Sequence, residues 1–266
     1  MSFFVDFHIH SSYSDGAYSC GEIEEICLEN NVKYISITDH DDIQSSDYKF
    51  KKIKNINGIE LSTFYGESEI HLLGYGYKSR NKKLLKISRK IQKERVERFE
   101  RMLFKAKKIN LLSNKNYKKK YNLNYKKDQL GRNKMAEILI KERACRNKQH
   151  AYNKYLGENK MLYEPVKQYN VFEGFQLLKN ECKIVALAHP QITKKDEIIK
   201  ELAERGMNGI EVYYPFHDAV IIDFYLNLTE KYNILPVGGS DFHKGEYNFK
   251  LKNEKVSDFL NRFNLF

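Results

Sequence analysis

The stretch DFHIHSSYSDG, residues 6–16, lies close to the N-terminus and carries histidines on alternate positions within an apolar run. In a strand, residues two apart point to the same side, so His8 and His10 face one way and their apolar neighbours face the other. That geometry suits a metal ion, and Asp15 follows as a further oxygen donor. Neutral histidines also occur in many protein cores, so this motif alone does not distinguish core histidines from metal ligands. The residues in the rest of the chain are needed to separate the two interpretations.

Short apolar runs rich in β-branched and aromatic residues recur along the chain, with helical periodicity between them. A capping-box pattern of Ser19 and Glu22 predicts the start of the first helix, with Ile23, Ile26 and Cys27 on its buried face. The alternation of strand and helix predicts an α/β fold of parallel units that close into a barrel or form an open sheet. The predicted strands are Phe3–Ile9, Tyr34–Thr38, Ile56–Leu61, Ile70–Tyr75, Ile184–Ala188, Gly209–Tyr213 and Ile234–Val237.

Residues 78–166 interrupt this rhythm. They contain two predicted helices, Ile87–Ile109 and Leu130–Glu142, joined by a connection rich in lysine, asparagine and tyrosine. From Lys78 to Lys134 there are 22 basic and 4 acidic residues, so this segment carries +18 and the rest of the +11 chain carries −7. We predict that residues 1–77 and 167–266 form the β/α domain and that residues 78–166 form an inserted basic helical cap. Its charge indicates either a solvated face or a surface that collects phosphorylated ligands.

Composition limits the class of protein. With 266 residues and 41% hydrophobic content, the chain can bury one sizeable core or a core with a small added lobe. The sequence contains no run of about 20 apolar residues and no signal peptide pattern, so we expect a soluble, cytoplasmic protein with no membrane partner. Nothing in the sequence indicates an obligate protein partner. The four cysteines form no C-x-x-C pair, which predicts reduced thiols and argues against zinc fingers and redox motifs.

Further metal-binding residue types stand where the predicted strands end. In β/α folds the carboxyl ends of the strands open onto one face, where catalytic groups gather. One ion uses four to six donors, so a set of nine candidate ligands implies two or three ions. Without cations, so many unpaired histidines and carboxylates packed together would carry a large desolvation cost. His150 is expected on the surface, and His217 is expected at the rim of the site or as a ligand. The predicted metal ligands are His8, His10, Asp15, His40, Glu60, His71, His189, Asp241 and His243.

Taken together, the motifs DFHIHSSYSDG, ITDHDD, GIELS, IHLLGYGY, LAHP, GIEVYYP and GGSDFHKG resemble the PHP (polymerase and histidinol phosphatase) family of metal-dependent phosphoesterases. The resemblance spans the chain. It implies a distorted seven-stranded (β/α)7 barrel with a helical cap, and a site for three divalent ions, usually manganese, with iron or zinc as alternatives. The basic insertion is similar to the branch of nucleoside 3′,5′-bisphosphate phosphatases and 5′→3′ exonucleases of short RNA.

The resemblance also implies a division of the ligands and a mechanism. A water bridging two ions, held by Asp15, His40 and Glu60, would lose a proton and attack phosphorus. Ser240 of the GGSD motif is then expected to be structural rather than a nucleophile. The implied groups are His8, His10, Glu60 and Asp241 for a first ion, Asp15, His40 and His243 for a second, and Glu60, His71 and His189 for a third.

Substrate contacts are expected from the basic segment. Arg95 and Arg98 stand three apart in KERVERFERM, on one helix face, as a phosphate fork needs. In GRNKMA, Arg132 keeps the guanidinium of the family's Gly-Arg-Pro-His-like motif, whereas Asn133 and Lys134 replace its proline and histidine. Substrate binding is assigned to Arg95, Arg98, Arg132, Lys134 and His217, within the diffuse field of Lys118, Lys119, Lys120, Lys126 and Lys127.

Three functions remain open at this stage. The preferred one is hydrolysis of phosphate esters of nucleotides or of short RNA or DNA, as a 3′-phosphatase of nucleoside 3′,5′-bisphosphates, a 5′→3′ exonuclease, or both. A second is a small-metabolite phosphatase such as histidinol-phosphate phosphatase, against which the basic insertion argues. The third is a non-catalytic nucleic-acid-binding module, against which the intact set of predicted ligands argues.

Overall fold

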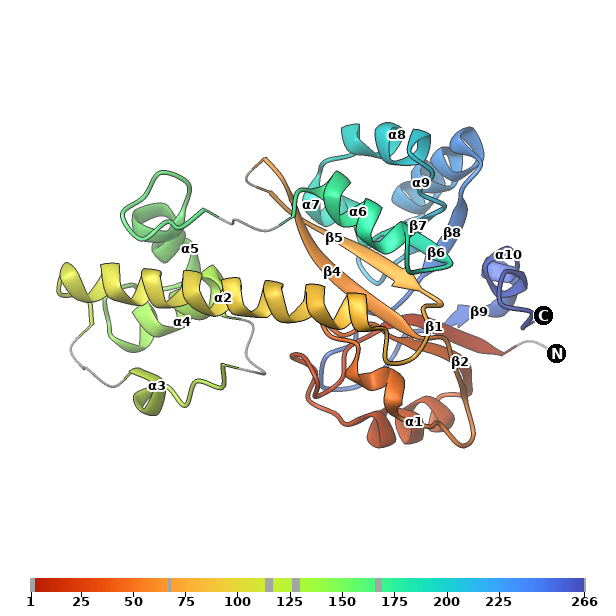
Figure 1. Cartoon of the computed structure of the whole chain (residues 1–266), viewed down its shortest axis with the longest axis horizontal. Coiled ribbons are helices and arrows are strands. Elements are labelled where there is room, and N and C mark those ends of the chain that lie inside the picture. The colour runs from red at the N-terminus through yellow and green to blue at the C-terminus, as the bar shows by residue number, and fades with distance from the viewer. Residues whose placement is uncertain (1–2, 67, 113–116, 126–129, 166–168, 266) are drawn as a thin grey trace. The chain divides into compact units, whose positions relative to one another are not determined.

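The chain divides into two compact units, seen here in a computed structural model that describes residues 3–66, 68–112, 117–125, 130–165 and 169–265 (Figure 1). Met1–Ser88 and Tyr169–Phe266 form the first, which we call the sheet unit, and Arg89–Gln168 form the second, which we call the helical unit. The prediction that residues 78–166 act as a cap stays a prediction.

The first sheet of the sheet unit contains the strand that opens the sequence. Its order is β3-β2-β1-β9, with β1 at Phe4–Ile9, β2 at Val32–Ile37, β3 at Lys54–Asn55 and β9 at Leu251–Lys252. β1 and β2 run parallel, β2 and β3 run parallel, and β9 joins β1 antiparallel. The short strands β3 and β9 are absent from the sequence prediction, since two residues carry no recognisable period.

The second sheet has the order β4-β5-β6-β7-β8. Its strands pair antiparallel from β4 through β6 and parallel from β6 through β8. All seven predicted strands are found, the first two as β1 and β2 and the other five here, with ends shifted by up to four residues. The bounds are β4 Gly58–Tyr65, β5 Ser68–Tyr75, β6 Ile184–Leu187, β7 Gly209–Tyr213 and β8 Leu235–Gly238.

The expectation of uniformly parallel strands is wrong at β4, β5 and β6, and the two sheets are not closed into a (β/α)7 barrel. β4 and β5 form a hairpin in which Tyr65 lies opposite Ser68, and Gly66 takes the left-handed conformation (φ +57°) that glycine adopts readily. Isolated bridges nevertheless connect the sheets, since Ile9 pairs with Phe242 and His40 pairs with Glu60. The mixed α/β fold therefore stands, without a barrel.

Helices of the sheet unit pack against both sheets. α1 begins with the predicted capping box, in which the Ser19 hydroxyl accepts a hydrogen bond from the Glu22 N–H. This helix packs on β2, α6 packs on β4 and β5, and α9 packs on β7 and β8. The side chains of Phe7 and Phe259 meet with ring centroids 4.6 Å apart in a core shared by β1, β5, β6 and β8. The bounds are α1 Cys20–Glu29, η1 Gln44–Asp47, α6 Val171–Lys179, α7 Pro190–Thr193, α8 Glu197–Glu204, α9 Ala219–Tyr232, η3 Asn253–Val256 and α10 Ser257–Asn261.

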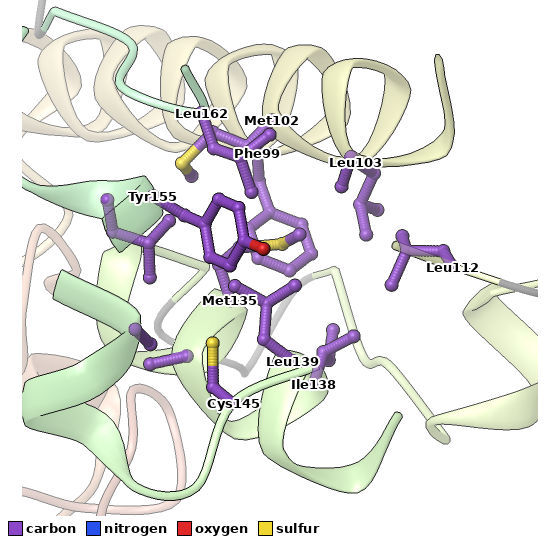
Figure 2. Close-up of a cluster of buried hydrophobic side chains, with 14 of the residues drawn as sticks. Phe99, Met102, Leu103, Leu112, Met135, Ile138, Leu139, Cys145, Tyr155 and Leu162 are labelled. Atoms are coloured by element: carbon purple, nitrogen blue, oxygen red, sulfur yellow. The ribbon is translucent and has the colours of Figure 1, made fainter. Parts of the chain in front are cut away.

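The helical unit has its own apolar core. Phe99 and Met102 of α2 point toward Tyr155 and Met135, as Figure 2 shows, and all four side chains are buried. Helix α2 extends over Lys82–Lys108, where the sequence predicts Ile87–Ile109, so it belongs to both units. The other elements of this unit are α3 Tyr117–Lys120, α4 Arg132–Lys141, α5 Lys148–Ala151 and the π-helix η2 Tyr152–Leu156.

Two further observations concern membrane-spanning helices and the cysteines. Among the described residues, the model contains no helix with both the length and the apolar character to span a membrane. Cys20, Cys27, Cys145 and Cys182 all carry free thiols, and the first three are buried. The free thiols agree with the prediction of reduced cysteines.

Candidate metal centre

β1 and the turn after it deliver the first three predicted ligands. His8 lies in β1 and His10 directly follows it, both fully buried, and the chain then turns back so that Asp15 faces His10 (Nδ1 to Oδ1, 3.7 Å). A side chain at Gly16 would place a Cβ 2.1 Å from the His10 carbonyl oxygen, so this close turn requires glycine. The Asp39 carboxylate stabilises the turn by accepting hydrogen bonds from the Ser11 N–H, the Ser11 hydroxyl and the Ser14 hydroxyl.

Glu60 of β4 lies at the centre of the predicted ligands. Its carboxylate is fully buried and has five imidazole nitrogens within 3.2 Å. Oε2 faces His8 Nε2 (3.2 Å), His10 Nε2 (3.1 Å) and His40 Nδ1 (3.0 Å). Oε1 faces His71 Nδ1 (2.7 Å) and His189 Nε2 (3.0 Å).

Asp241 and His243 reach the same place from the loop after β8. Asp241 Oδ1 lies 3.0 Å from His10 Nε2 and 3.4 Å from His8 Nε2. His243 Nε2 lies 3.2 Å from Asp15 Oδ1, and its other nitrogen donates to the Asp241 carbonyl oxygen (2.7 Å). The structure therefore brings all nine predicted ligands together in the sheet unit.

Ligand atoms of eight of these nine residues, all but His189, fall into three groups in which every atom is within 4.8 Å of the others. One group has the membership expected for a first ion. A second contains the three residues expected for a second ion together with His10, and the third contains His40 in place of His189. The groups are His8, His10, Glu60 and Asp241; His10, Asp15, His40 and His243; and His40, Glu60 and His71.

The chemistry of these atoms fits divalent metal ions. His8 Nε2, both nitrogens of His10, His40 Nδ1 and Glu60 Oε2 are buried and lack a partner in hydrogen-bond geometry, although they lie close to one another. Buried polar atoms without partners are costly, so a set of them gathered in the donor groups indicates cations that they share. Imidazole and carboxylate donors suit manganese, iron and zinc.

Electrostatics differs between the members of the cluster. Burial lowers the pKa of His10, but the carboxylates of Asp241 and Glu60 outweigh it and raise the pKa to about 10. Burial lowers the pKa of His40 to about 3, since the neighbouring His10 and His71 partly cancel the effect of the carboxylates. Burial raises the pKa of Asp241, yet the nearby histidines outweigh it and hold the pKa well below its usual range.

Several polar residues behind the ligands escaped the sequence prediction. Asp6 accepts from the Ser240 N–H (2.9 Å) and from the Ser240 hydroxyl, which agrees with a structural role for Ser240. The Tyr214 hydroxyl donates to Asp241 Oδ2 (3.1 Å), and Glu211 contacts His8 (2.9 Å). Tyr214 and Glu211 belong to GIEVYYP, so the motif was visible, but the partners of its side chains were not.

Comparisons with known proteins give a consistent result. The sequence matches no family model. It is 22% identical over 249 residues to a 3′,5′-nucleoside bisphosphate phosphatase of Chromobacterium violaceum, covering 90% of this chain and 87% of the relative. It is 22% identical over 248 residues to a 5′-3′ exoribonuclease of Haemophilus influenzae (90% and 89%), and 19% identical over 249 residues to a phosphoribosyl 1,2-cyclic phosphate 1,2-diphosphodiesterase of Eggerthella lenta (90% and 93%).

Solved structures extend the likeness to the fold. A metal-dependent phosphoesterase of Bifidobacterium adolescentis superposes with a TM-score of 0.76 at 19% identity, covering 97% of this chain and 96% of the other. A two-domain protein of Bacteroides vulgatus with a PHP-like metal-dependent phosphoesterase superposes with a TM-score of 0.53 at 14% identity, covering 98% and 63%. The chain has the PHP-like phosphoesterase fold. At these identities the likeness to the solved structures shows the fold.

The predicted substrate residues lie mostly in the helical unit. Arg95 and Arg98 lie on α2, half-buried and buried respectively, and Lys134 lies on α4. The Arg132 guanidinium, at the start of α4, lies over the Tyr152 and Tyr163 rings, 5.7 and 5.8 Å from their centroids. Their role in binding substrate stays a prediction.

The remaining predicted positions differ in exposure. His217 is buried in the sheet unit, where its Nδ1 donates to the Val212 carbonyl oxygen (2.8 Å). His150 lies on α5, partly exposed, with its Nδ1 accepting from the Arg146 N–H (3.3 Å). Of the predicted lysine field, Lys119 and Lys120 are exposed, whereas Lys126 and Lys127 lie outside the described residues.

Proposed function

We propose that the chain is a metal-dependent phosphoesterase that hydrolyses phosphate esters of nucleotides or short oligonucleotides. The observation that carries this proposal is the convergence of six imidazoles and three carboxylates, among them the buried Glu60, with several of their atoms lacking hydrogen-bond partners. The proposed ions are manganese, with iron or zinc as alternatives, and three ions would use the three groups of donors.

The charge of the donor set suits a phosphate ester. With neutral imidazoles, Asp15, Glu60 and Asp241 contribute a formal charge of −3, so three divalent ions would leave the centre positive toward an anionic substrate. When bound, such ions neutralise the phosphate and lower the pKa of water enough to supply a nucleophile at neutral pH. We assign Asp15, His40 and Glu60 to the part of the centre that holds the attacking water. Tyr214, which donates to Asp241, keeps that carboxylate oriented.

Nucleotide substrates are favoured by charge and by the relatives. Residues 78–134 carry a net charge of +18, which attracts polyanionic ligands. The relatives from Chromobacterium violaceum and Haemophilus influenzae are named for a nucleoside bisphosphate and for RNA. We therefore propose a 3′-phosphatase of nucleoside 3′,5′-bisphosphates, or a 5′→3′ exonuclease of short RNA, with Arg95, Arg98, Arg132, Lys134 and His217 in substrate binding.

A phosphate-release assay tests this function. Chelator-treated protein is reloaded with manganese, iron or zinc and assayed on nucleoside 3′,5′-bisphosphates, 5′-phosphorylated trinucleotides of RNA and DNA, and histidinol phosphate. We expect turnover to require the metal and to be fastest on the bisphosphate or the RNA. Preferential turnover of histidinol phosphate would instead support the small-metabolite phosphatase.

A pair of variants separates chemistry from folding. Glu60→Gln alters the centre. Glu24→Gln alters another buried carboxylate, on α1, which accepts hydrogen bonds from the backbone N–H groups of Lys51 and Lys52. Near-normal turnover in Glu60→Gln would reject the proposed centre. Metal-loaded wild type that cleaves none of these esters while binding RNA would reject the proposed hydrolase and favour a binding module.

A further inference from the structure

Glu211 connects two parts of the metal centre without belonging to the ligand groups. It lies in β7, fully buried, and uses both oxygens of its carboxylate. Oε1 lies 2.9 Å from His8 Nδ1, and Oε2 accepts from the His189 backbone N–H at 2.7 Å. One side chain therefore contacts a ligand of the first sheet and the backbone of a ligand that follows β6.

The contact with His8 fixes which nitrogen faces the other ligands. A carboxylate only accepts hydrogen bonds, so a neutral His8, the form that binds metal, carries its proton on Nδ1 and keeps a lone pair on Nε2. His8 Nε2 points to Glu60 Oε2 (3.2 Å) and Asp241 Oδ1 (3.4 Å). This is the arrangement in which an outer carboxylate orients a metal-binding histidine and raises its basicity.

The contact with His189 supports a strained backbone. His189 has φ +26° and ψ 60°, a conformation that residues other than glycine rarely adopt, and it directly precedes Pro190. Such conformations persist only where neighbouring groups hold them. The bond from its N–H to Glu211 holds this turn, and the turn directs His189 Nε2 to Glu60 Oε1 at 3.0 Å.

We propose that Glu211 is a positioning residue that sets both His8 and His189 for metal binding. This inference rests on the proposed function and adds a residue that orients the ligands. The carboxylate is required because it accepts two hydrogens at once. Glutamine has one acceptor oxygen and one donor NH2 group, so in Glu211→Gln either the His8 imidazole or the His189 N–H would face a donor.

Metal affinity of the full chain tests this role. Chelator-treated wild type, Glu211→Gln and Glu211→Ala are titrated with Mn²⁺ by calorimetry, and thermal unfolding is recorded with and without Mn²⁺. We expect Mn²⁺ affinity to fall about 10- to 100-fold in Glu211→Gln, the range for outer residues that orient ligands, and further in Glu211→Ala. Glu211→Gln changes the shape of the side chain little, so it keeps the test valid if the alanine variant does not fold.

Glu24→Gln is the matched control. Glu24 is also a buried carboxylate, and its Oε1 accepts from the backbone N–H groups of Lys51 and Lys52, both at 2.7 Å. We expect this variant to unfold at a lower temperature but to bind Mn²⁺ like wild type. Equal losses of affinity in both glutamine variants would show a general effect of weakening the fold and would overturn the proposal.

Two further outcomes separate this inference from the proposed function. If folded Glu211 variants bind Mn²⁺ as tightly as wild type, Glu211 has no positioning role, whatever the substrate. If wild type binds Mn²⁺ more tightly than Glu211→Gln but cleaves no phosphate ester, the positioning role stands and the proposed function fails. Wild type that binds no metal would overturn both.

Discussion

His40 and Glu60 pair with each other through both backbone and side chains. Their backbones form an isolated parallel bridge, in which the Asp41 N–H donates to the Glu60 carbonyl oxygen (2.9 Å), and His40 Nδ1 lies 3.0 Å from Glu60 Oε2. The bridge joins the chain after β2 to β4, so the two sheets meet where the candidate ligands gather. The same contacts that hold the sheets together thus set the position of the central carboxylate.

We predict that Glu60→Gln removes most of the activity while the fold persists. The amide keeps the shape of the side chain but loses the charge and places an NH2 donor among the imidazoles. Since bound ions supply several kcal/mol of transition-state stabilisation, turnover should fall by about 1,000-fold. Phosphate release measures turnover, elemental analysis measures metal content, and circular dichroism checks the fold. A folded Glu60→Gln protein with near-normal turnover would contradict the proposed centre.

The second prediction concerns pH and the chelator-treated protein. The folded pKa of His10, about 10, exceeds its unfolded value of 6.5, so the stability that His10 contributes is complete below pH 6.5 and is lost as pH rises toward 10. His40 acts in the opposite direction, with a folded pKa of about 3, and its contribution is lost as pH falls below 6.5. Metal-free protein should therefore become less stable from about pH 7 to pH 10.

Thermal unfolding across that pH range checks this prediction. Each kcal/mol lost should lower Tm by roughly 2–4 °C for a protein of this size. Mn²⁺ should reduce the loss, because neutral imidazoles bind metal and deprotonation then favours the bound state. His10→Asn should flatten the pH dependence of the metal-free protein. A metal-free Tm that stays constant or rises between pH 7 and pH 10 would contradict the assigned effect of the carboxylates on His10.

The third prediction concerns the close passage of the GGSD segment over β1. A Cβ on Gly239 would lie 2.2 Å from His8 Cβ and 2.4 Å from the His8 nitrogen, so Gly239→Ala must push the two segments apart. We expect a loss of about 1–3 kcal/mol in the free energy of unfolding, as for other overpacked sites, together with weaker Mn²⁺ binding. Urea unfolding and calorimetry measure these quantities.

Gly21→Ala is the control for this substitution. Gly21 lies in α1, and the nearest atom to an added Cβ is the hydroxyl of Tyr48 at 3.2 Å, at the end of a side chain on the surface. Alanine favours a helix more than glycine does, so stability should be maintained or rise slightly and Mn²⁺ binding should not change. Similar Mn²⁺ affinities in both alanine variants would mean that the Gly239 contact does not position His8.

The positions of the strands were readable from the sequence, but the antiparallel pairing at β4, β5 and β6 was not predicted. The predicted strands Ile56–Leu61 and Ile70–Tyr75 leave eight residues between them, fewer than the dozen or more that a parallel crossover needs. Loop length therefore argued for the antiparallel pair β4 and β5 that the structure has. The general alternation of strands and helices hid this local exception.

The gathering of the predicted ligands followed from their place at the ends of strands. His40, His189 and Asp241 each come just after a strand, where topology brings distant segments to one place. Glu211 and Asp6 were missed for a different reason. Each lies inside a strand, and a polar residue there gives no indication of its partner, which for Asp6 stands 234 residues away at Ser240.

The fourth prediction concerns the lysines of the helical unit. Their field is diffuse and is screened beyond about 10 Å at 0.1 M salt. Neutralising several of them should lower kcat/KM for oligonucleotides mainly at low salt and should flatten its salt dependence. The lysines to replace are Lys118, Lys119, Lys120, Lys126 and Lys127. An unchanged salt dependence would indicate that this charge is only a solvated face.

The fifth prediction assigns Arg132 to the second phosphate of a bisphosphate. A charge-assisted hydrogen bond is worth about 1.5–3 kcal/mol, so Arg132→Ala should lower kcat/KM on a nucleoside 3′,5′-bisphosphate by roughly 10- to 150-fold. A monophosphate lacks that contact and should be affected much less. Arg146→Ala removes the same charge from an exposed position of the helical unit and should affect both substrates little. Equal losses on both substrates in Arg132→Ala would instead assign Arg132 to folding or to the metal centre, and would favour the small-metabolite phosphatase.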